Sequence, residues 1–138
     1  MAVKRKRILA VDDDPAALAV VKQILAQRGY DVITAASGED ALEILGRDTP
    51  DLMLLDVSMP GISGFDLCRQ VRQDARTKDT PVIFLSAKGM LPDMVEGKSA
   101  GSDLYLVKPV LATKLVNMVG MFLSTEAPLA KKPRRVSS

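Results

Sequence analysis

The fold of this chain is decided by one stretch of its sequence, Asp51-Leu52-Met53-Leu54-Leu55-Asp56-Val57-Ser58-Met59-Pro60-Gly61. The apolar run from Leu52 to Leu55 is too short to cross a membrane and is typical of a strand that is buried on both faces. Asp56 stands where the run ends, and the turn signal Pro60-Gly61 follows it. Ligands of open parallel sheets bind at the carboxyl ends of the strands, and a charge there needs a metal, a cation or hydrogen bonds to offset its burial. Asp56 is therefore the first candidate functional residue.

The composition indicates one globular domain. The chain has 138 residues, of which 47% are hydrophobic and 26% charged, and this length allows a substantial core. Since no apolar run reaches the roughly 20 residues that a membrane span needs, we expect no membrane insertion. The basic N-terminus precedes an apolar run that three aspartates cut short, unlike a signal peptide. A single cysteine, Cys68, excludes an internal disulfide and favours the cytoplasm.

The charges divide the chain into three parts. Residues 1–7 are a basic lead-in, residues 8–124 are the expected domain, and residues 125–138 are expected to be a disordered basic tail or linker. Residues 8–125 hold 11 basic and 16 acidic side chains, a net charge of −5. We therefore expect no nucleic-acid binding by the domain itself. The chain has no histidine, which excludes imidazole catalysis, histidine-bound zinc and an internal phosphohistidine.

Short apolar runs alternate with helical patterns along the chain. The runs predict strands at residues 8–11, 32–33, 52–55, 82–85 and 104–107. Helices are predicted from Pro15 until Gly29, from the N-cap Ser37 to Leu45, over 64–73, from near Pro92 to Gly101, and from about 111 to 123. Five strands alternating with five helices predict a parallel sheet with helices on both of its faces.

Polar residues follow four of these strands. They are Asp12, Asp13 and Asp14 after the first strand, Asp56 after the third, Ser86 at the end of the fourth and Lys108 after the fifth. All stand at carboxyl ends, so we expect them to converge on one edge of the sheet.

This set has the chemistry of a phosphoryl-transfer site. Mg²⁺ prefers one or two carboxylates, waters and phosphate oxygens, which Asp12, Asp13, Asp56 and a carbonyl just after Asp56 would satisfy. Lys108 and the Ser86 hydroxyl would stabilise the oxygens of a transferring phosphoryl group, and an aspartate can itself be the nucleophile. Each residue alone could instead be a helix cap, a loop carboxylate, a turn residue or a strand terminator. Capping does not require all four strand ends together, so the set favours the site.

Four motifs of the chain match a known family. They are Val11-Asp12-Asp13-Asp14-Pro15, Leu55-Asp56-Val57-Ser58-Met59-Pro60-Gly61 with Gly64, Leu85-Ser86-Ala87-Lys88-Gly89 and Ala100-Gly101-Ser102-Asp103-Leu104-Tyr105-Leu106-Val107-Lys108-Pro109. Over about residues 6–124, the chain thus resembles the receiver domain of two-component response regulators. The resemblance implies a flavodoxin-like, doubly wound (βα)5 fold with strand order 2-1-3-4-5. It also implies a partner, either a histidine kinase or a histidine phosphotransfer protein, and no catalysis beyond the domain's own phosphorylation and dephosphorylation.

The resemblance assigns a role to each site residue. Asp56 is implied to be the phosphoacceptor, Asp13 a direct ligand of Mg²⁺ (Mn²⁺ being possible), and Asp12 a ligand acting mainly through water. The remaining implied roles are a Ser58 carbonyl ligand, a phosphate-binding Lys108 before a cis proline, a switch hydroxyl on Ser86, a rotating switch ring on Tyr105, and Ser58 and Lys88 as residues that tune phosphoryl lifetime. Serine in place of the commoner threonine at 86, and Val110 in place of phenylalanine, are small departures from the family pattern.

A switch of this kind needs an output surface. We expect Ser86 to move toward the phosphoryl oxygens and Tyr105 to fill the space it leaves, which shifts the fourth helix, the fifth strand and the last helix. The last helix has a broad apolar arc, and Met90, Leu91 and Met94 add apolar surface beside the fourth helix. We predict that this face binds a downstream protein or a second copy, with a broad core-facing helix as the alternative.

Two other functions compete with the receiver interpretation. A haloacid-dehalogenase-like phosphohydrolase would use the Asp-x-Asp of Asp12 and Asp14 with Lys108, but the chain lacks a cap domain. A receiver-like interaction module that needs no phosphate is the second alternative, and the intact acidic set argues against it.

Overall fold

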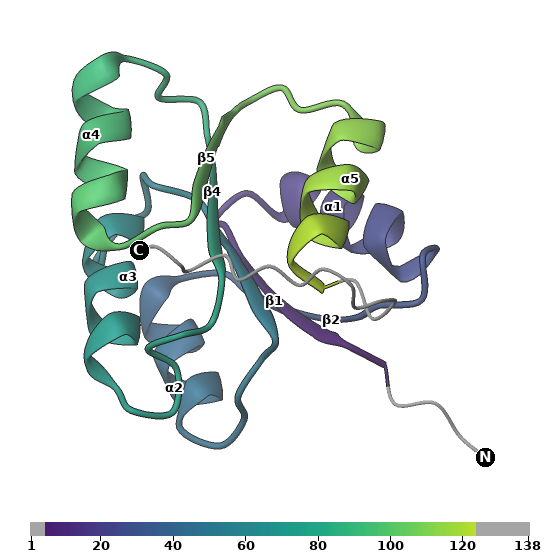
Figure 1. Cartoon of the computed structure of the whole chain (residues 1–138), viewed down its shortest axis with the longest axis horizontal. Coiled ribbons are helices and arrows are strands. Elements are labelled where there is room, and N and C mark those ends of the chain that lie inside the picture. The colour runs from purple at the N-terminus through teal and green to yellow at the C-terminus, as the bar shows by residue number, and fades with distance from the viewer. Residues whose placement is uncertain (1–4, 124–138) are drawn as a thin grey trace.

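A five-stranded parallel sheet forms the centre of the protein in the computed structural model, which describes residues 5–123 (Figure 1). Its strands are β1 (Arg7–Val11), β2 (Asp31–Ala35), β3 (Leu52–Leu55), β4 (Val82–Ser86) and β5 (Leu104–Val107). They lie in the order β2-β1-β3-β4-β5, and every neighbouring pair is parallel. This is the predicted order, and it confirms the flavodoxin-like α/β fold.

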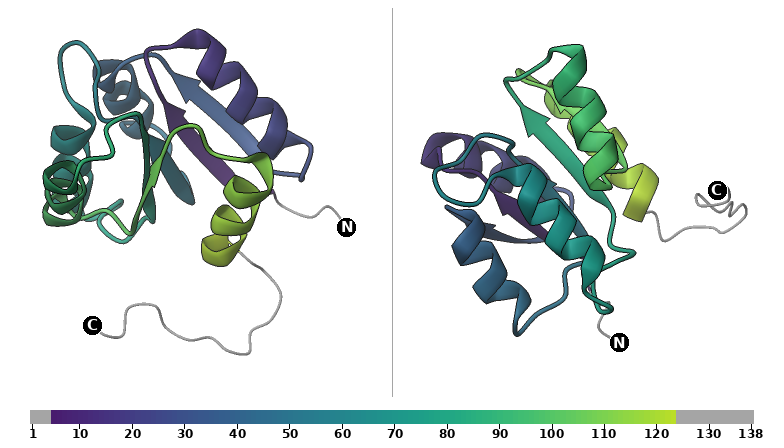
Figure 2. Two further views of the ribbon diagram at one scale, coloured as in Figure 1. Left: turned by 90° about the horizontal axis from the view of Figure 1, so that it is seen from above. Right: turned by 90° about the vertical axis from the view of Figure 1, so that its left-hand side faces the viewer.

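Five helices cover the two faces of the sheet (Figures 1 and 2). On one face lie α1 (Pro15–Ala26) and α5 (Ala112–Leu123), and on the other α2 (Gly38–Leu45), α3 (Gly64–Gln73) and α4 (Leu91–Ala100). The right-hand view of Figure 2 shows α3 in teal and α4 in green side by side nearest the viewer. None of these helices is long and apolar enough to cross a bilayer.

Strand β3 is buried on both faces, as its apolar sequence predicted. Its four side chains are at most 2% exposed. They alternate between two cores: Leu52 and Leu54 pack toward α1 and α5, and Met53 and Leu55 pack toward α2, α3 and α4. The continuous apolar run therefore reflects helices on both sides of the sheet.

Side-chain caps start three of the helices. The Asp14 carboxylate accepts a hydrogen bond from the backbone N–H of Ala16, and the Ser37 and Ser63 hydroxyls accept from Asp40 and Asp66 at 3.0 and 3.1 Å. These bonds satisfy amide groups that a helix start leaves without intrahelical partners. The predicted cap at Ser37 is confirmed.

Several element boundaries differ from the predicted ones. β1 begins at Arg7 and β2 covers residues 31–35, because all five residues of β2 pair in register with those of β1. α1 ends at Ala26, before Gly29, and α5 begins at Ala112. The predicted disordered tail lies outside the residues that the structure describes.

Candidate functional site

Three carboxylates meet at the carboxyl edge of the sheet, where the sequence predicted them. Asp12 and Asp56 follow directly after paired residues, since Val11 of β1 is in register with Leu55 of β3. The Asp56 N–H donates to the carbonyl oxygen of Val11 at 2.9 Å. One oxygen each from Asp12, Asp13 and Asp56 all lie within 4.8 Å of one another. Asp12 and Asp56 are both 8% exposed, whereas Asp13 is exposed to solvent.

Lys108 supplies the cation of the cluster. Its Nζ lies 2.7 Å from Oδ2 of Asp12 and 3.8 Å from Oδ1 of Asp56. Its backbone N–H donates to the carbonyl oxygen of Ser86 at 2.8 Å. This hydrogen bond holds the backbone of Lys108 beside the end of β4. Burial lowers the pKa of Lys108, but the hydrogen bond to Asp12 and the surrounding carboxylates outweigh it, so that the pKa is raised. The Lys108–Pro109 bond is cis, as the resemblance implied.

The surroundings of Asp56 perturb its carboxyl group. Burial first, and the charge of Asp12 second, raise its pKa to about 6, although Lys108 acts in the opposite direction. At neutral pH the ionised Asp56 is thus held at an energetic cost beside two like charges. A divalent cation would remove this repulsion, and carboxylate oxygens are the donors that Mg²⁺ prefers. The donor set therefore fits a magnesium site.

Asp14, the third residue of the acidic run, has a different role from Asp12. Asp12 also accepts a hydrogen bond from the Asp14 N–H through Oδ1, at 3.0 Å. The side chain of Asp14 instead caps α1. Asp14 is thus a helix cap, which was one of the alternatives that the sequence left open. This role argues against Asp14 as the second aspartate of a phosphohydrolase Asp-x-Asp pair.

The loop after Asp56 is held by contacts that the sequence did not indicate. Oε2 of Glu39, on α2, accepts a hydrogen bond from the N–H of Ile62 at 3.3 Å. A Cβ added to Gly64 would lie 2.1 Å from the backbone oxygen of Asp56, so only glycine lets α3 start this close to β3. Gly64 belongs to one of the motifs found in the sequence. Glu39 is 23 residues from Ile62, and no motif indicated that these two residues make contact. These contacts fix the segment that contains the Ser58 carbonyl.

Comparisons with known proteins identify the family of this chain. The sequence model of the response regulator receiver domain matches residues 8–120. The chain belongs to this family. It is 45% identical over 103 residues to the transcriptional regulatory protein AfsQ1 of Streptomyces coelicolor, covering 75% of this chain and 44% of AfsQ1. It is 36% identical over 118 residues to the protein PilH of Pseudomonas aeruginosa, covering 86% of this chain and 98% of PilH.

Solved structures of receiver domains and response regulators have the same fold as this chain. The structure of CheY4 from Vibrio cholerae superposes with a TM-score of 0.83 at 32% identity, covering 87% of this chain and 100% of CheY4. The chain spans about half the length of the first curated relatives it matches, 44% of AfsQ1 and 53% of MprA from Mycobacterium leprae. The predicted family and fold are thus confirmed.

In this receiver domain, hydrogen bonds connect the predicted switch residues. Ser86 is 1% exposed, and its hydroxyl accepts from the N–H of Lys88 at 3.0 Å. The Lys88 carbonyl in turn accepts from the hydroxyl of Tyr105. The Tyr105 ring lies 5.8 Å from the ring of Phe84, between centroids. A Cβ added to Gly97 would lie 2.9 Å from Cδ2 of Tyr105, so Gly97 makes room for this ring.

The two predicted lifetime-tuning residues lie together beside the acceptor loop. Ser58 and Lys88 line one open cleft of about 560 Å³, which also contains Met59 and Glu96. Both are exposed, so solvent and a partner can reach them.

Proposed function

We propose that this receiver domain accepts a phosphoryl group on Asp56 from the phosphohistidine of a histidine kinase or a histidine phosphotransfer protein. A carboxylate oxygen of Asp56 forms the new bond to phosphorus, the phosphorus–nitrogen bond breaks, and the imidazole leaves with the electron pair. The observation that carries the proposal is a buried carboxylate whose pKa is raised to about 6, beside two further carboxylates and a lysine. We place this reaction in the cytoplasm because the one cysteine, Cys68, is unpaired.

The surrounding residues stabilise the charge that is transferred. Asp12, Asp13, Asp56 and the Ser58 carbonyl would hold Mg²⁺, or Mn²⁺ in its place. When bound, this ion neutralises phosphoryl oxygens and removes the repulsion among the carboxylates. Lys108 donates to a phosphoryl oxygen from its position 3.8 Å from Asp56, and the Ser86 hydroxyl donates to another. The protein catalyses only the gain and loss of this group.

The proposed output surface lies over α4 and β5. Its apolar side chains are exposed: Met90 70%, Leu91 71%, Val95 59% and Val107 39%. On α5 the apolar arc faces mainly the core, since Leu115, Val119 and Leu123 are buried, and this supports the alternative of a broad core-facing helix for most of that arc. Leu111 and Met121 remain 75% and 66% exposed at its margins. We propose that phosphorylation changes how this surface binds a downstream protein or a second copy.

Intact mass spectrometry tests the phosphoacceptor directly. The full chain is incubated with acetyl phosphate and Mg²⁺, beside Asp56→Asn as the matched variant. We expect one added phosphoryl group on the native chain and none on the variant. An adduct that persists in Asp56→Asn contradicts the assignment of Asp56.

A second arm separates a short-lived adduct from a domain that does not use phosphate. Beryllofluoride with Mg²⁺ mimics the phosphoryl group without being hydrolysed. The part of the tyrosine fluorescence that Tyr105→Phe removes, leaving that of Tyr30, reports on the switch. A change in fluorescence without a mass adduct indicates fast hydrolysis. The absence of both favours the phosphate-independent interaction module. Turnover of a phosphate ester by Asp56→Asn, lost in Asp12→Asn, would instead favour the phosphohydrolase.

A further inference from the structure

Helix α4 is held firmly at its C-terminal end. Its two buried residues, Gly97 and Ala100, both lie in the second half of the helix. The thiol of Cys68, on α3, donates to the carbonyl oxygen of Ala100 at 3.3 Å. The helix ends at Gly101, whose left-handed conformation (φ 108°) lets its N–H and that of Ser102 bond back to carbonyls of the last turn.

The N-terminal half of the same helix is held less firmly, and its side-chain bond to α3, the ion pair of Glu96 with Arg69, is exposed. Its N-cap residue, Met90, makes no side-chain capping bond. No residue from Leu91 to Glu96 is buried, and Leu91 and Val95 are 71% and 59% exposed. Apolar burial and capping are what hold a helix end in place, so this half has a lower cost of local opening than the other.

One side chain, Arg72 of α3, ties the fixed end to several neighbouring segments. Its Nε donates to the carbonyl oxygen of Gly101 at 2.8 Å, and one terminal nitrogen bonds to Asp103 at 3.0 Å. The other terminal nitrogen donates to the carbonyl oxygens of Lys78 and Thr80 at 3.1 and 2.6 Å.

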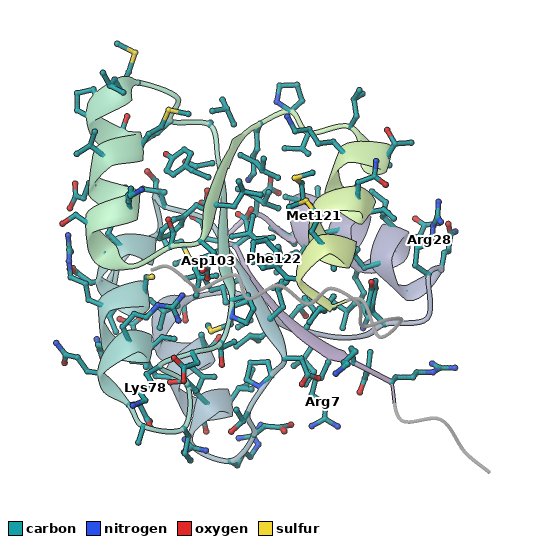
Figure 3. All side chains as sticks on the ribbon, viewed as in Figure 1. Arg7, Arg28, Lys78, Asp103, Met121 and Phe122 are labelled. Carbon is teal, nitrogen blue, oxygen red and sulfur yellow. The ribbon has the colours of Figure 1, made fainter. Side chains whose placement is uncertain are left out.

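The acceptors of Arg72 belong to several elements. Asp103 also accepts from the N–H of Val82 at 2.9 Å, so the same carboxylate fixes the start of β4. Figure 3 labels Asp103 where β5 begins, below α4, and Lys78 beyond the end of α3. The Arg72 side chain is only 21% exposed, which strengthens these charge-assisted bonds relative to surface pairs. A single guanidinium therefore joins the end of α3, the end of α4 and the starts of two strands.

We infer that Arg72 is a positioning residue that fixes the C-terminal end of α4 as a pivot, and that movement of α4 is confined to its N-terminal half. The contacts of Tyr105 fall on the two sides of this division. Its ring lies against Gly97, where the fixed half begins. Its hydroxyl donates to the carbonyl oxygen of Lys88, just before the free end. A displacement of Ser86 and Lys88 thus acts on the N-terminal end of α4. The Tyr105 ring, in contrast, stays packed against the C-terminal half of that helix.

The pivot exists in the free protein, whereas its use in signalling rests on the proposed function. Hydrogen exchange resolved by peptide tests the pivot in the full chain without any phosphoryl mimic. The variants are Arg72→Ala, Arg72→Lys and, as the matched control on the same helix, Arg69→Ala, which removes exposed ion pairs with Asp66 and Glu96.

In the native chain we expect the amides of residues 97–104 to exchange at least about tenfold more slowly than those of 91–96. Arg72→Ala should abolish most of that difference, because three hydrogen bonds to backbone acceptors, two of them partly buried, are lost together with the ion pair to Asp103. Arg72→Lys should restore only part of it, since lysine keeps the charge but not the planar fork. Arg69→Ala should preserve it. Amides of β1 and β3 should be unchanged in all three, which separates a local pivot from general destabilisation.

Two results would overturn the inference: equal exchange in the two halves of native α4, or a change of less than about twofold at 97–104 in both Arg72 variants. Beryllofluoride with Mg²⁺ is then added to the native chain. Faster or slower exchange confined to residues 87–96 supports the pivot in signalling, and an equal change at 97–104 contradicts it. If beryllofluoride changes no peptide, the proposed phosphorylation switch fails, while the result in the free protein still decides the pivot.

Discussion

Replacing Asp56 by asparagine should stabilise the metal-free protein at neutral pH. Burial and the charge of Asp12 raise the pKa of Asp56 from 3.8 to about 6, so the folded state binds this proton more tightly than the unfolded chain does. Stability therefore falls as the pH rises from about 4 to about 6, and it stays at the lower level above that range. The pKa difference corresponds to about 3 kcal/mol of lost stability at pH 7.5. Asp56→Asn removes this charge and should recover up to that amount.

Urea denaturation of both proteins in EDTA, at several pH values between 4 and 8, measures this effect. The free-energy difference between variant and native chain should be near zero at pH 4, grow up to about pH 6 and then remain constant. Adding Mg²⁺ at pH 7.5 should narrow it, because the ion stabilises the native site more than the variant one. Equal stabilities at pH 7.5, or a difference that is just as large at pH 4, would refute the argument from a buried ionised carboxylate.

Three further predictions concern other parts of the domain. Gly64→Ala should lower the free energy of unfolding by at least about 3 kcal/mol, because its Cβ would meet the Asp56 oxygen at 2.1 Å. The control Gly120→Ala, with nothing within 4 Å, should raise it by about 0.5–1 kcal/mol in the same denaturation assay. Burial raises the pKa of the Cys68 thiol to about 11, so a thiol reagent should label it only after unfolding, and labelling of the native protein at pH 8 would contradict this. Lys108→Ala should slow phosphorylation of Asp56 by acetyl phosphate roughly 100-fold, as followed by intact mass, and an unchanged rate would remove the lysine from the site.

The residues at the sheet edge could be predicted from the sequence because their position depends only on local information. The continuous apolar run Leu52–Leu55 itself indicates a strand that is buried on both faces. The residue that follows a parallel strand lies at the carboxyl edge of the sheet. No side-chain contact had to be known to place Asp12, Asp56 and Lys108 together. In the structure, a carboxylate oxygen of each aspartate lies within 4 Å of the lysine nitrogen.

Contacts to distant backbone atoms could not be predicted in the same way. Arg72 reaches a carbonyl 29 residues away and Glu39 an amide 23 residues away, and neither acceptor depends on the identity of the residue that carries it. The sequence alone also offered no reason for a glycine at position 97. The structure adds a steric reason, the ring of Tyr105, which required the placement of α4 on β5.

The apolar arc of the last helix shows a related limit. Periodicity reports which residues are apolar, but it does not tell which neighbours cover them. Leu115 and Val119 pack into the core beneath α5, while Leu111 in the same arc is 75% exposed. The exposed apolar surface lies instead mainly on the N-terminal half of α4, at Met90 and Leu91.

The position of Lys108 suggests how the proposed reaction reaches that surface. The lysine nitrogen is closer to Asp12, at 2.7 Å, than to Asp56, at 3.8 Å. A phosphoryl group on Asp56 carries about −1.5 to −2 charges in place of the single charge of the carboxylate, and it competes with Asp12 for the lysine. The backbone of Lys108 is bonded to Ser86, whose hydroxyl is bonded to Lys88. In the proposed reaction, the same charge therefore attracts the lysine and the serine at neighbouring strand ends. The segment that leads into the free end of α4 follows this serine directly, and the N–H of Lys88 bonds it to the serine hydroxyl.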